Sequence, residues 1–513
     1  MQIVIGKISL LASGLPRSWM LIGYILPMAL ACAGIAGLPV SMALISIISA
    51  LLCCYLLGKQ SEALMVITPF STLVLSTAIA CYDGASAEHS AIASLMTLFT
   101  GIWLLLLTFV LPRGRMNWIA RPVWHGICLG ITIILVVLVV PMLLGVIPEN
   151  NTWTSFWKVV THWQNWHWPS VVLSLISILL FLLWHPSHQP KALWLIVLMW
   201  ILGNIWSFDV IGVMLPVRPK WQFMLLTNVV DPDWLSFIFM SASIALLIYI
   251  EICQHLAYQV HHNFEMAGVI NVLSGIVGGI VVGLCRISGR VYKVEHQLLP
   301  MTLLLLLLTL CWWWSAYIPL PALGVIALYV LYRQFRWCEL RLYWRQWSDI
   351  CVLAFTALFI ISVGILSGIW LIMTLSMIFM WWRLVRKRAW PLLQPELQII
   401  TDTIVITLPQ PLLFANARSL LHYVGDLAKD LPHQKVYMDV HCGCCLDVTV
   451  LIYLQSLARR MYWHQKKLYL CGLTEQALKV LQEKHLDYLP AEQLRTTPVL
   501  QLLSDSIQLE NKS

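Results

Sequence analysis

Charged side chains are scarce in this 513-residue chain. Only 11% of its residues are charged, 60% are hydrophobic and the mean hydropathy is +0.80. Soluble globular chains carry roughly 25% charged residues, so this composition excludes an ordinary soluble protein. The charges that are present gather near the C-terminus, where residues 390–513 hold 12 of the 24 acidic and 11 of the 32 basic residues. Because charge is costly in hydrocarbon, we predict a membrane domain over residues 1–389 and a soluble domain over residues 390–513.

Signatures of several other protein classes are missing as well. The net charge of +8 comes from the apolar part of the chain, whereas the tail is nearly neutral. This distribution suits loops at an anionic lipid surface and not a nucleic-acid groove. No nucleophile–base pair or phosphate loop stands out, which argues against an enzyme and predicts no cofactor. The 14 Cys do not have the spacing of a disulfide scaffold, and no cleavable signal peptide is evident.

One cysteine cluster has a second interpretation. The segment His441-Cys442-Gly443-Cys444-Cys445 contains soft ligands that zinc or copper prefers. A second CxxC pair that would complete four ligands is missing, and the segment precedes a predicted helix. We therefore favour buried structural cysteines over a metal site.

The apolar part divides into runs of membrane-spanning length, each of which needs about 20 residues. Basic residues cluster between 113 and 121, between 333 and 345 and between 383 and 388, and the positive-inside rule places all three clusters in the cytoplasm. The loop 148–168 has one Lys and no Arg and is expected outside. Both termini are then cytoplasmic, in a plasma or bacterial inner membrane. Interface anchoring is expected of Trp118, Trp124, Trp163, Trp166, Trp168, Trp381 and Trp382.

The tail alternates between strand and helix patterns. Strands are predicted at Ile404–Leu408, Lys435–Val440 and Lys467–Cys471, and helices at Ala415–Leu427, Thr449–Arg460 and Glu475–Glu483. This alternation indicates a small α/β domain around one sheet.

Several motifs, in order along nearly the whole chain, give it a resemblance to the SulP family of anion transporters with a C-terminal STAS domain. Each motif is weak alone, and their order makes the joint match fairly specific. The motifs are Leu26-Pro27-Met28-Ala29 with Ile35-Ala36-Gly37-Leu38-Pro39, Ala120-Arg121-Pro122-Val123, Tyr258–Glu265 with Gly268 and Asn271, Tyr317–Leu323, Leu413–Ala417 and Leu446-Asp447-Val448-Thr449.

The resemblance implies an α-helical polytopic membrane protein with 14 spans in an inverted 7+7 repeat, plus a small cytosolic α/β STAS-like domain. It implies a core domain moving against a gate domain, half-helices at the third and tenth spans, and a homodimer. Helix N-termini at such breaks direct partial positive charge toward an anion, and broken helices are tolerated where they line a cavity.

Candidate substrate-binding residues follow from the same resemblance. Thr68-Pro69-Phe70 stands where the family breaks its third span, although an ordinary proline kink is the alternative. Glu251 ends an uncharged run near the family's functional eighth-span position. A carboxylate there would repel an anion unless it were protonated or paired, which suggests a coupling proton. The alternative is that the span ends there and Glu251 faces the cytosol.

Three further candidates depart from the family pattern. Arg286 and Ser288 follow a glycine-rich run (Gly275, Gly278, Gly279, Gly283), in which small residues allow close helix packing, and Arg286 could pair with an anion. The alternative is that they are loop residues near the interface. Cys32 stands where the family's first span often has an aromatic residue.

Regulation has one candidate residue. Thr449 matches the position at which some STAS domains are phosphorylated, and the simpler alternative is a hydroxyl at a helix N-terminus.

Two functions remain open at this stage. The first is a secondary active transporter of an inorganic anion, with sulfate ahead of bicarbonate or a dicarboxylate and with a proton or sodium ion as a possible coupling ion. The second is a membrane sensor or scaffold that does not transport and that signals through the STAS-like domain.

Overall fold

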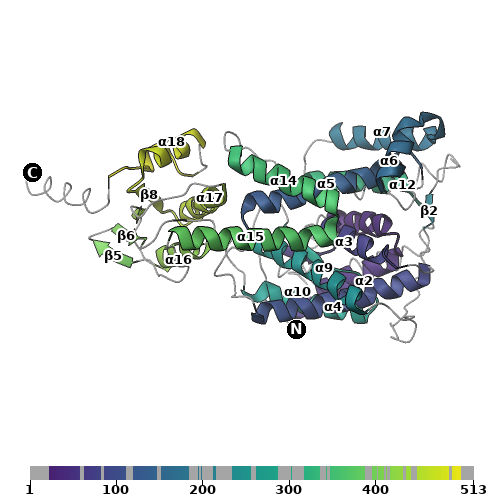
Figure 1. Ribbon diagram of the computed structural model, residues 1–513, viewed down its shortest axis with the longest axis horizontal. Coiled ribbons are helices and arrows are strands. Elements are labelled where there is room, and N and C mark those ends of the chain that lie inside the picture. The colour runs from purple at the N-terminus through teal and green to yellow at the C-terminus, as the bar shows by residue number, and fades with distance from the viewer. Residues whose placement is uncertain are drawn as a thin grey trace, which may run out of the picture. The chain divides into compact units, whose positions relative to one another are not determined.

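The computed structural model divides the chain into two compact units (Figure 1). Unit 1 comprises residues 1–111, 128–335 and 358–369, and unit 2 comprises residues 112–127, 336–357 and 370–513. The structure describes residues 22–57, 63–82, 86–110, 119–146, 152–183, 194–195, 198, 212–214, 234–255, 261–286, 302, 317–334, 343, 347–387, 396–400, 403–408, 412, 416–430, 435–440, 448–484 and 488–497.

Unit 1 is built of apolar helices. Its helices are Ile22–Ala36, α2 (Val40–Leu57), α3 (Pro69–Ile79), α4 (Ser86–Val110), α6 (Thr152–Thr161), η1 (Trp163–Asn165), α7 (Trp168–Leu183), α9 (Trp234–His255), α10 (His261–Ile276) and α12 (Leu320–Gln334). Three further helices pass from one unit into the other along the chain: α5 (Arg121–Leu143), α14 (Trp347–Val363) and α15 (Ile365–Lys387).

Three helices of the described part are long and apolar enough to cross a membrane. They are Glu88–Val110, Arg121–Leu143 and Trp234–Gln254, and eight shorter apolar helices accompany them. Large apolar side chains such as Phe109, Leu182 and Leu235 remain exposed on these helices, as expected for a protein whose surroundings are lipid. Helical membrane-type architecture was predicted correctly, whereas the 14 spans and the inverted repeat stay predictions.

Glycines let α4 and α10 approach closely, and Figure 1 shows the two helices side by side. A Cβ atom added at Gly101 would lie 2.5 Å from the backbone nitrogen of Val272, and one at Gly275 would lie 2.5 Å from that of Leu98. Small residues at a helix crossing allow such backbone contact. The predicted role of Gly275 in helix packing is therefore confirmed.

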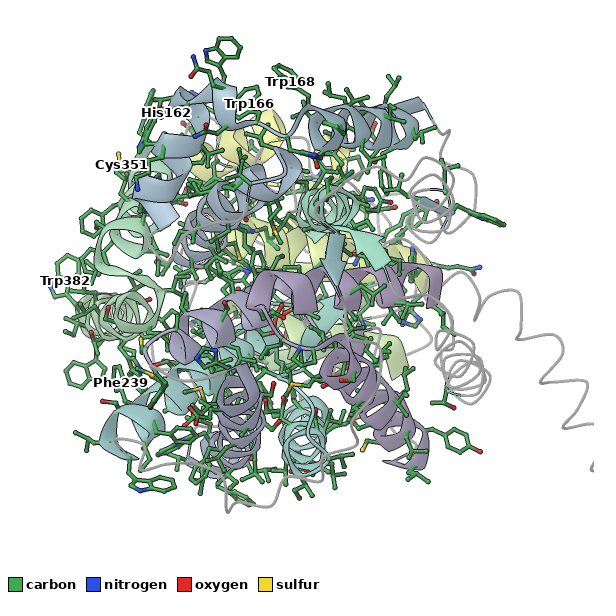
Figure 2. All side chains as sticks on the ribbon, turned by 90° about the vertical axis from the view of Figure 1, so that its right-hand side faces the viewer. His162, Trp166, Trp168, Phe239, Cys351 and Trp382 are labelled. Carbon is green, nitrogen blue, oxygen red and sulfur yellow. The ribbon has the colours of Figure 1, made fainter. Side chains whose placement is uncertain are left out.

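The predicted tryptophan anchors differ among themselves. Figure 2 shows the side chains of Trp168 and Trp382 pointing away from their helices, and both are exposed, as are Trp163 and Trp381. Trp124 is 3% exposed, so the prediction for this residue is wrong: it packs inside the protein. Trp118 lies outside the described residues.

Two short antiparallel strand pairs interrupt the helices of unit 1. Strand β1 (Ala63–Val66) pairs with β3 (Gly283–Arg286), and β2 (Gly212–Met214) pairs with β4 (Tyr317–Pro319). In the first pair Val66 stands opposite Gly283 and Ala63 opposite Arg286.

The C-terminal part of unit 2 is a four-stranded sheet with helices. Its strands are β5 (Glu396–Ile400), β6 (Thr403–Thr407), β7 (Lys435–Asp439) and β8 (Lys467–Cys471), and they follow one another in the sheet in that order. The helices are α16 (Ala417–Asp430), α17 (Val448–Trp463), α18 (Glu475–Lys484) and the short η6 (Ala491–Gln493). The pair β5–β6 is antiparallel, whereas β6–β7 and β7–β8 are parallel.

The parallel pairs need crossovers, and α16 and α17 provide them. Every strand and helix predicted for the tail is present, with ends shifted by at most a few residues. The strand β5 was missed, and the border between the domains at residues 389 and 390 stays a prediction.

The thiol of Cys471 offers a test of the sheet interior. Cys471 is buried at the end of β8, and burial raises the pKa of its thiol to about 12. The thiolate is the reactive form, so we expect Cys471 to resist iodoacetamide at pH 8 in the folded protein and to react after unfolding in denaturant. Peptide mapping by mass spectrometry compares the two states. Rapid labelling of Cys471 without denaturant would contradict this packing.

Candidate functional site

The N-terminus of α3 lies in the interior of unit 1 and is surrounded by hydroxyl groups. Thr68 is the N-cap and fully buried, and its hydroxyl accepts a hydrogen bond from the Ser71 backbone N–H at 3.3 Å. The Ser71 and Thr72 hydroxyls donate back to the Thr68 carbonyl at 3.1 and 2.8 Å. Pro69 occupies the first helical position, where its missing N–H costs nothing. Thr68-Pro69 therefore starts a helix and does not kink one.

Helix α3 is also short. Its 11 residues rise only about 16 Å at 1.5 Å per residue, and the chain reaches it through the strand β1. The chain is therefore not one continuous helix through Thr68, and its assignment to the third span of the family stays a prediction. A helix N-terminus carries a partial positive charge, so this buried end is suited to an anion.

Glu251 lies beside this helix end. It is one turn from the C-terminus of α9, yet only 1% of it is exposed. The alternative in which Glu251 faces the cytosol at the end of its span is therefore wrong. Helix α9 packs against both α3 and β3, which brings the carboxylate to the same region as Thr68.

Gly283, the first residue of β3, joins these two side chains. A Cβ atom at this position would lie 2.8 Å from Glu251 Oε2 and 2.9 Å from Thr68 Oγ1. A carboxylate oxygen and a hydroxyl thus face the same small space, which only glycine leaves open. The described site combines a helix N-terminus, hydroxyl groups and one titratable carboxylate, and this set can hold an anion together with a proton.

The other candidates have different positions. Phe70 is buried in the first turn of α3, and Cys32 is buried in the helix Ile22–Ala36. Arg286 ends β3, three residues after Gly283, and pairs there with Ala63. Ser288 lies outside the described residues, as do His441–Cys445 and Asp447. Among the residues that the structure describes, no group of three His, Cys, Asp or Glu could hold a metal ion.

Thr449, the candidate regulatory residue, belongs to unit 2. It lies in the first turn of α17 and is 1% exposed. Its hydroxyl accepts a hydrogen bond from the backbone N–H of Arg121 at 3.0 Å. The side chain is thus engaged with the start of α5, and a modifying enzyme could reach it only after this contact opened.

Sequence reasoning missed Gly283 as a site residue, and it missed the polar side chains that bind the irregular segment before β3. The glycine-rich run was interpreted as helix packing alone. Gly278 instead adopts a φ of +86° at the end of α10, and Gly283 lines the site. A signal was available: helix packing does not need four glycines within nine residues, whereas a turn into a strand uses them well.

Comparison with known proteins gives a consistent result. Residues 15–357 match the sulfate permease family. The chain is 24% identical over 396 residues to a protein named "Probable sulfate transporter MT1781" from Mycobacterium tuberculosis (strain CDC 1551 / Oshkosh), and the match covers 72% of this chain and 69% of that protein.

Solved structures share the fold. Murine Solute Carrier 26 family member A9, an anion transporter in the inward-facing state, aligns with a TM-score of 0.59 at 14% identity over 97% of this chain and 91% of its own. The transmembrane domain of the cyanobacterial bicarbonate transporter BicA aligns with a TM-score of 0.55 at 19% identity, over 69% of this chain and 96% of its own.

Replacing Gly283 tests the geometry of the site directly. We expect Gly283→Ala to lower the unfolding temperature of the purified protein, because the new methyl group overlaps Glu251 and Thr68, and overpacking of this kind costs about 1–3 kcal/mol. Gly34→Ala is the matched control, since a Cβ atom there meets only Leu323 Cδ1, at an ordinary 3.4 Å. Equal unfolding temperatures for the two variants would show that Gly283 is not packed as described.

Proposed function

The chain belongs to the sulfate permease family and is therefore an integral membrane anion transporter, and we propose that it carries a small inorganic anion, sulfate first, by alternating access. The family consists of permeases, so the protein is not an enzyme. Bicarbonate and dicarboxylates are the next candidates. The relative named a probable sulfate transporter supports sulfate, and the structural neighbour named a bicarbonate transporter supports bicarbonate.

The observation that carries the proposal is the buried α3 N-terminus facing Glu251 across Gly283. The anion binds at the Thr68 end of α3, where the partial positive charge of the helix and the hydroxyl groups replace part of its hydration shell. Cys32 and Phe70 contribute to the lining, and Arg286 and Ser288 are included in the proposed site on the strength of the sequence resemblance. Moving a charged substrate from water into a buried site costs free energy, and these groups compensate for the lost hydration.

Glu251 makes a proton the coupling ion of choice, with sodium as the alternative. Two negative charges in a buried space repel each other strongly, because the effective dielectric constant is low. Anion binding therefore favours protonated Glu251, and release of the anion favours loss of the proton. Inward transport driven by an inward proton gradient, that is symport, follows from this linkage.

The wider architecture completes the proposal. Residues 1–389 form 14 spans in an inverted 7+7 repeat in a plasma or inner membrane, with both termini in the cytoplasm. Residues 390–513 form a STAS-like domain, supported by the sheet order β5-β6-β7-β8 and its alternation with α16 and α17. The protein assembles as a homodimer in contact with membrane lipid and binds neither cofactor nor nucleic acid.

A sensing or regulatory role is the second candidate function, and the contacts of α17 with α14 and α5 in unit 2 favour it. The first N–H group of α17, on Val448, donates to the carboxylate of Asp349 in α14 at 3.2 Å. The neighbouring Thr449 hydroxyl accepts the Arg121 N–H at the start of α5, and the Arg121 guanidinium lies 5.5 Å from the ring centre of Tyr453. Asp349 of α14 thus caps the N-terminus of α17, and Thr449 of α17 in turn accepts the N–H at the start of α5. A displacement of α17 would therefore break its hydrogen bonds to α5 and α14.

Uptake into proteoliposomes tests the main proposal. We expect labelled sulfate to accumulate under an inward proton gradient, with bicarbonate and dicarboxylates as competitors and a sodium gradient as the comparison. Glu251→Gln should remove the response to pH, because the amide cannot exchange a proton. Thr68→Val and Arg286→Ala should lower uptake at least tenfold, which corresponds to about 1.4 kcal/mol.

The control for this experiment is Glu265→Gln, because Glu265 lies on α10 and is exposed. It should behave as the wild type does. Unchanged uptake in Thr68→Val and Arg286→Ala would refute the site. Absence of uptake of every anion by well-folded wild-type protein would refute transport and favour the sensor.

Variants at the α17 contact test coupling of the C-terminal domain to transport. We expect Thr449→Val and Asp349→Ala each to lower the maximal rate of sulfate uptake. KM should stay unchanged, because neither residue belongs to the proposed anion site. Asp426→Asn is the control: its partner is Arg460 in the same domain, and exposed ion pairs contribute little. Full rates in both test variants would show that α17 docks without affecting transport.

A further inference from the structure

The segment that leads from α10 into β3 is buried and leaves the helical hydrogen-bonding pattern. Ile280, Val281 and Val282 are each fully buried. The strand β3 has β1 as its neighbour along Gly283–Arg286, so the residues just before Gly283 have no paired strand in the described sheet. Buried backbone N–H and C=O groups nevertheless require partners.

The side chain of Asn271 in α10 takes the place of a strand for Val282. Its Oδ1 accepts the Val282 N–H at 2.8 Å, and its Nδ2 donates to the Val282 carbonyl at 2.9 Å. Nδ2 also donates to the Ala267 carbonyl at 2.9 Å. A hydrogen-bonded residue pair in an antiparallel sheet exchanges the same two bonds. Asn271 itself is fully buried.

Two serines hold Ile280 in the same manner. The Ser46 hydroxyl in α2 accepts the Ile280 N–H at 2.6 Å and donates to the Met42 carbonyl at 2.8 Å. The Ser274 hydroxyl in α10 lies 3.1 Å from both the Ile280 carbonyl and Ser46 Oγ and shares its proton between them. Both serines are fully buried, and a Cβ atom at Gly279 would overlap their hydroxyl oxygens.

These three side chains, Ser46, Asn271 and Ser274, bind the same buried segment, the serines at Ile280 and Asn271 at Val282, and we name them the strand tether. It ends one residue before Gly283, which faces Thr68 and Glu251. A shift of the Val282 peptide would move Gly283 with it, because the two residues are bonded. A buried hydrogen bond that loses one partner leaves the other group unsatisfied, so the tether fixes the backbone there more firmly than apolar packing alone would.

We propose that the strand tether positions the anion site: Asn271, assisted by Ser46 and Ser274, sets the location of Gly283 relative to Thr68 and Glu251 and thereby sets the affinity for the anion. The proposal rests on the transport function proposed above. The three residues do not touch the substrate and act as positioning residues. Asn271 is the central member, because its amide supplies a donor and an acceptor to the same peptide.

Asn271→Asp is the sharpest variant, since it keeps shape and changes hydrogen-bonding capacity. The ionised carboxylate still accepts the Val282 N–H, but it repels the Val282 carbonyl that the amide used to bind. A protonated carboxyl regains one donor. Burial favours the neutral carboxyl, so we expect sulfate KM to rise at least tenfold at alkaline pH, where the carboxyl ionises, and to recover toward the wild-type value as the pH falls. Asn271→Ala should raise KM at every pH.

The recovery is measured as the ratio of variant to wild-type KM, because other groups titrate as well. Ionisable or charged residues on β3 and on the elements packed against it and α10 are Cys53, Cys54, Tyr55, Glu88, His89, Tyr249, Glu251, Cys253, His255, His261, His262, Glu265, Cys285 and Arg286. They are the same in both proteins and cancel in the ratio.

Ser46→Ala is the milder second variant, in case Asn271→Asp folds poorly. It should raise KM several-fold with no recovery at low pH. Ser177→Ala is its control, because Ser177 is also fully buried but donates to the Leu173 carbonyl within its own helix. A normal KM is expected for this control.

Hydrogen exchange of the peptide that covers residues 280–286 completes the experiment without depending on transport. Faster exchange in the Asn271 and Ser46 variants, together with a higher KM, supports the proposal. Faster exchange with an unchanged KM, or unchanged exchange, overturns it. If the wild-type protein transports no anion, the proposed transport function is wrong. If the Asn271 and Ser46 variants exchange at the wild-type rate, the strand tether is wrong, whatever the transport result.

Discussion

Backbone hydrogen bonding is the constraint on which the rest of this structure depends. A membrane protein gains stability from helices because each helix satisfies its own N–H and C=O groups where water is absent. Wherever the chain leaves a helix in the buried interior, other groups have to supply those bonds. Around the start of α3 and β3, strand β1, the Thr68 hydroxyl and the side chains of Ser46 and Asn271 all do so.

An anion site inside this bundle needs a break in a buried helix, and such a break costs stability. An anion needs exposed donors and a partial positive charge, and only an interrupted helix provides them inside an apolar bundle. The interruption at Thr68 is stabilised by capping, by proline at the first helical position and by strand pairing. Glycine at 283 then leaves room for Glu251 next to the helix end. The candidate site is therefore formed by the same groups that stabilise the break in the helix.

Within unit 2, helix starts are also completed through backbone groups. The first N–H groups of an isolated helix lack partners, and in α17 Asp349 accepts one of them. At the start of α5 the Arg121 N–H finds Thr449. Each helix start is thus completed by a residue from a distant part of the chain. These contacts resist separation, because opening either of them removes the side-chain acceptor of a backbone N–H.

Local patterns in the sequence determined the class of the protein and much of its architecture. The scarcity of charge before residue 390 indicated membrane helices, and the alternating pattern after it located three of four strands and three helices of the tail to within a few residues. Strand β5 escaped because it joins β6 as an antiparallel neighbour with no helix between them, so it falls outside the alternation of strands and helices. The break at Thr68-Pro69 was predicted from the family resemblance, because a proline by itself was equally compatible with a kinked helix.

Only the tertiary structure decided which distant residues meet. Glu251, Thr68 and Gly283 are far apart in the chain, and their approach depends on how α9 packs against α3 and β3. The bonds from Asn271 and Ser46 to the segment before β3, and from Thr449 to Arg121, likewise depend on orientation. Sequence spacing fixes the face of a helix on which a side chain lies, but the partner across that face is fixed by the packing of the whole unit.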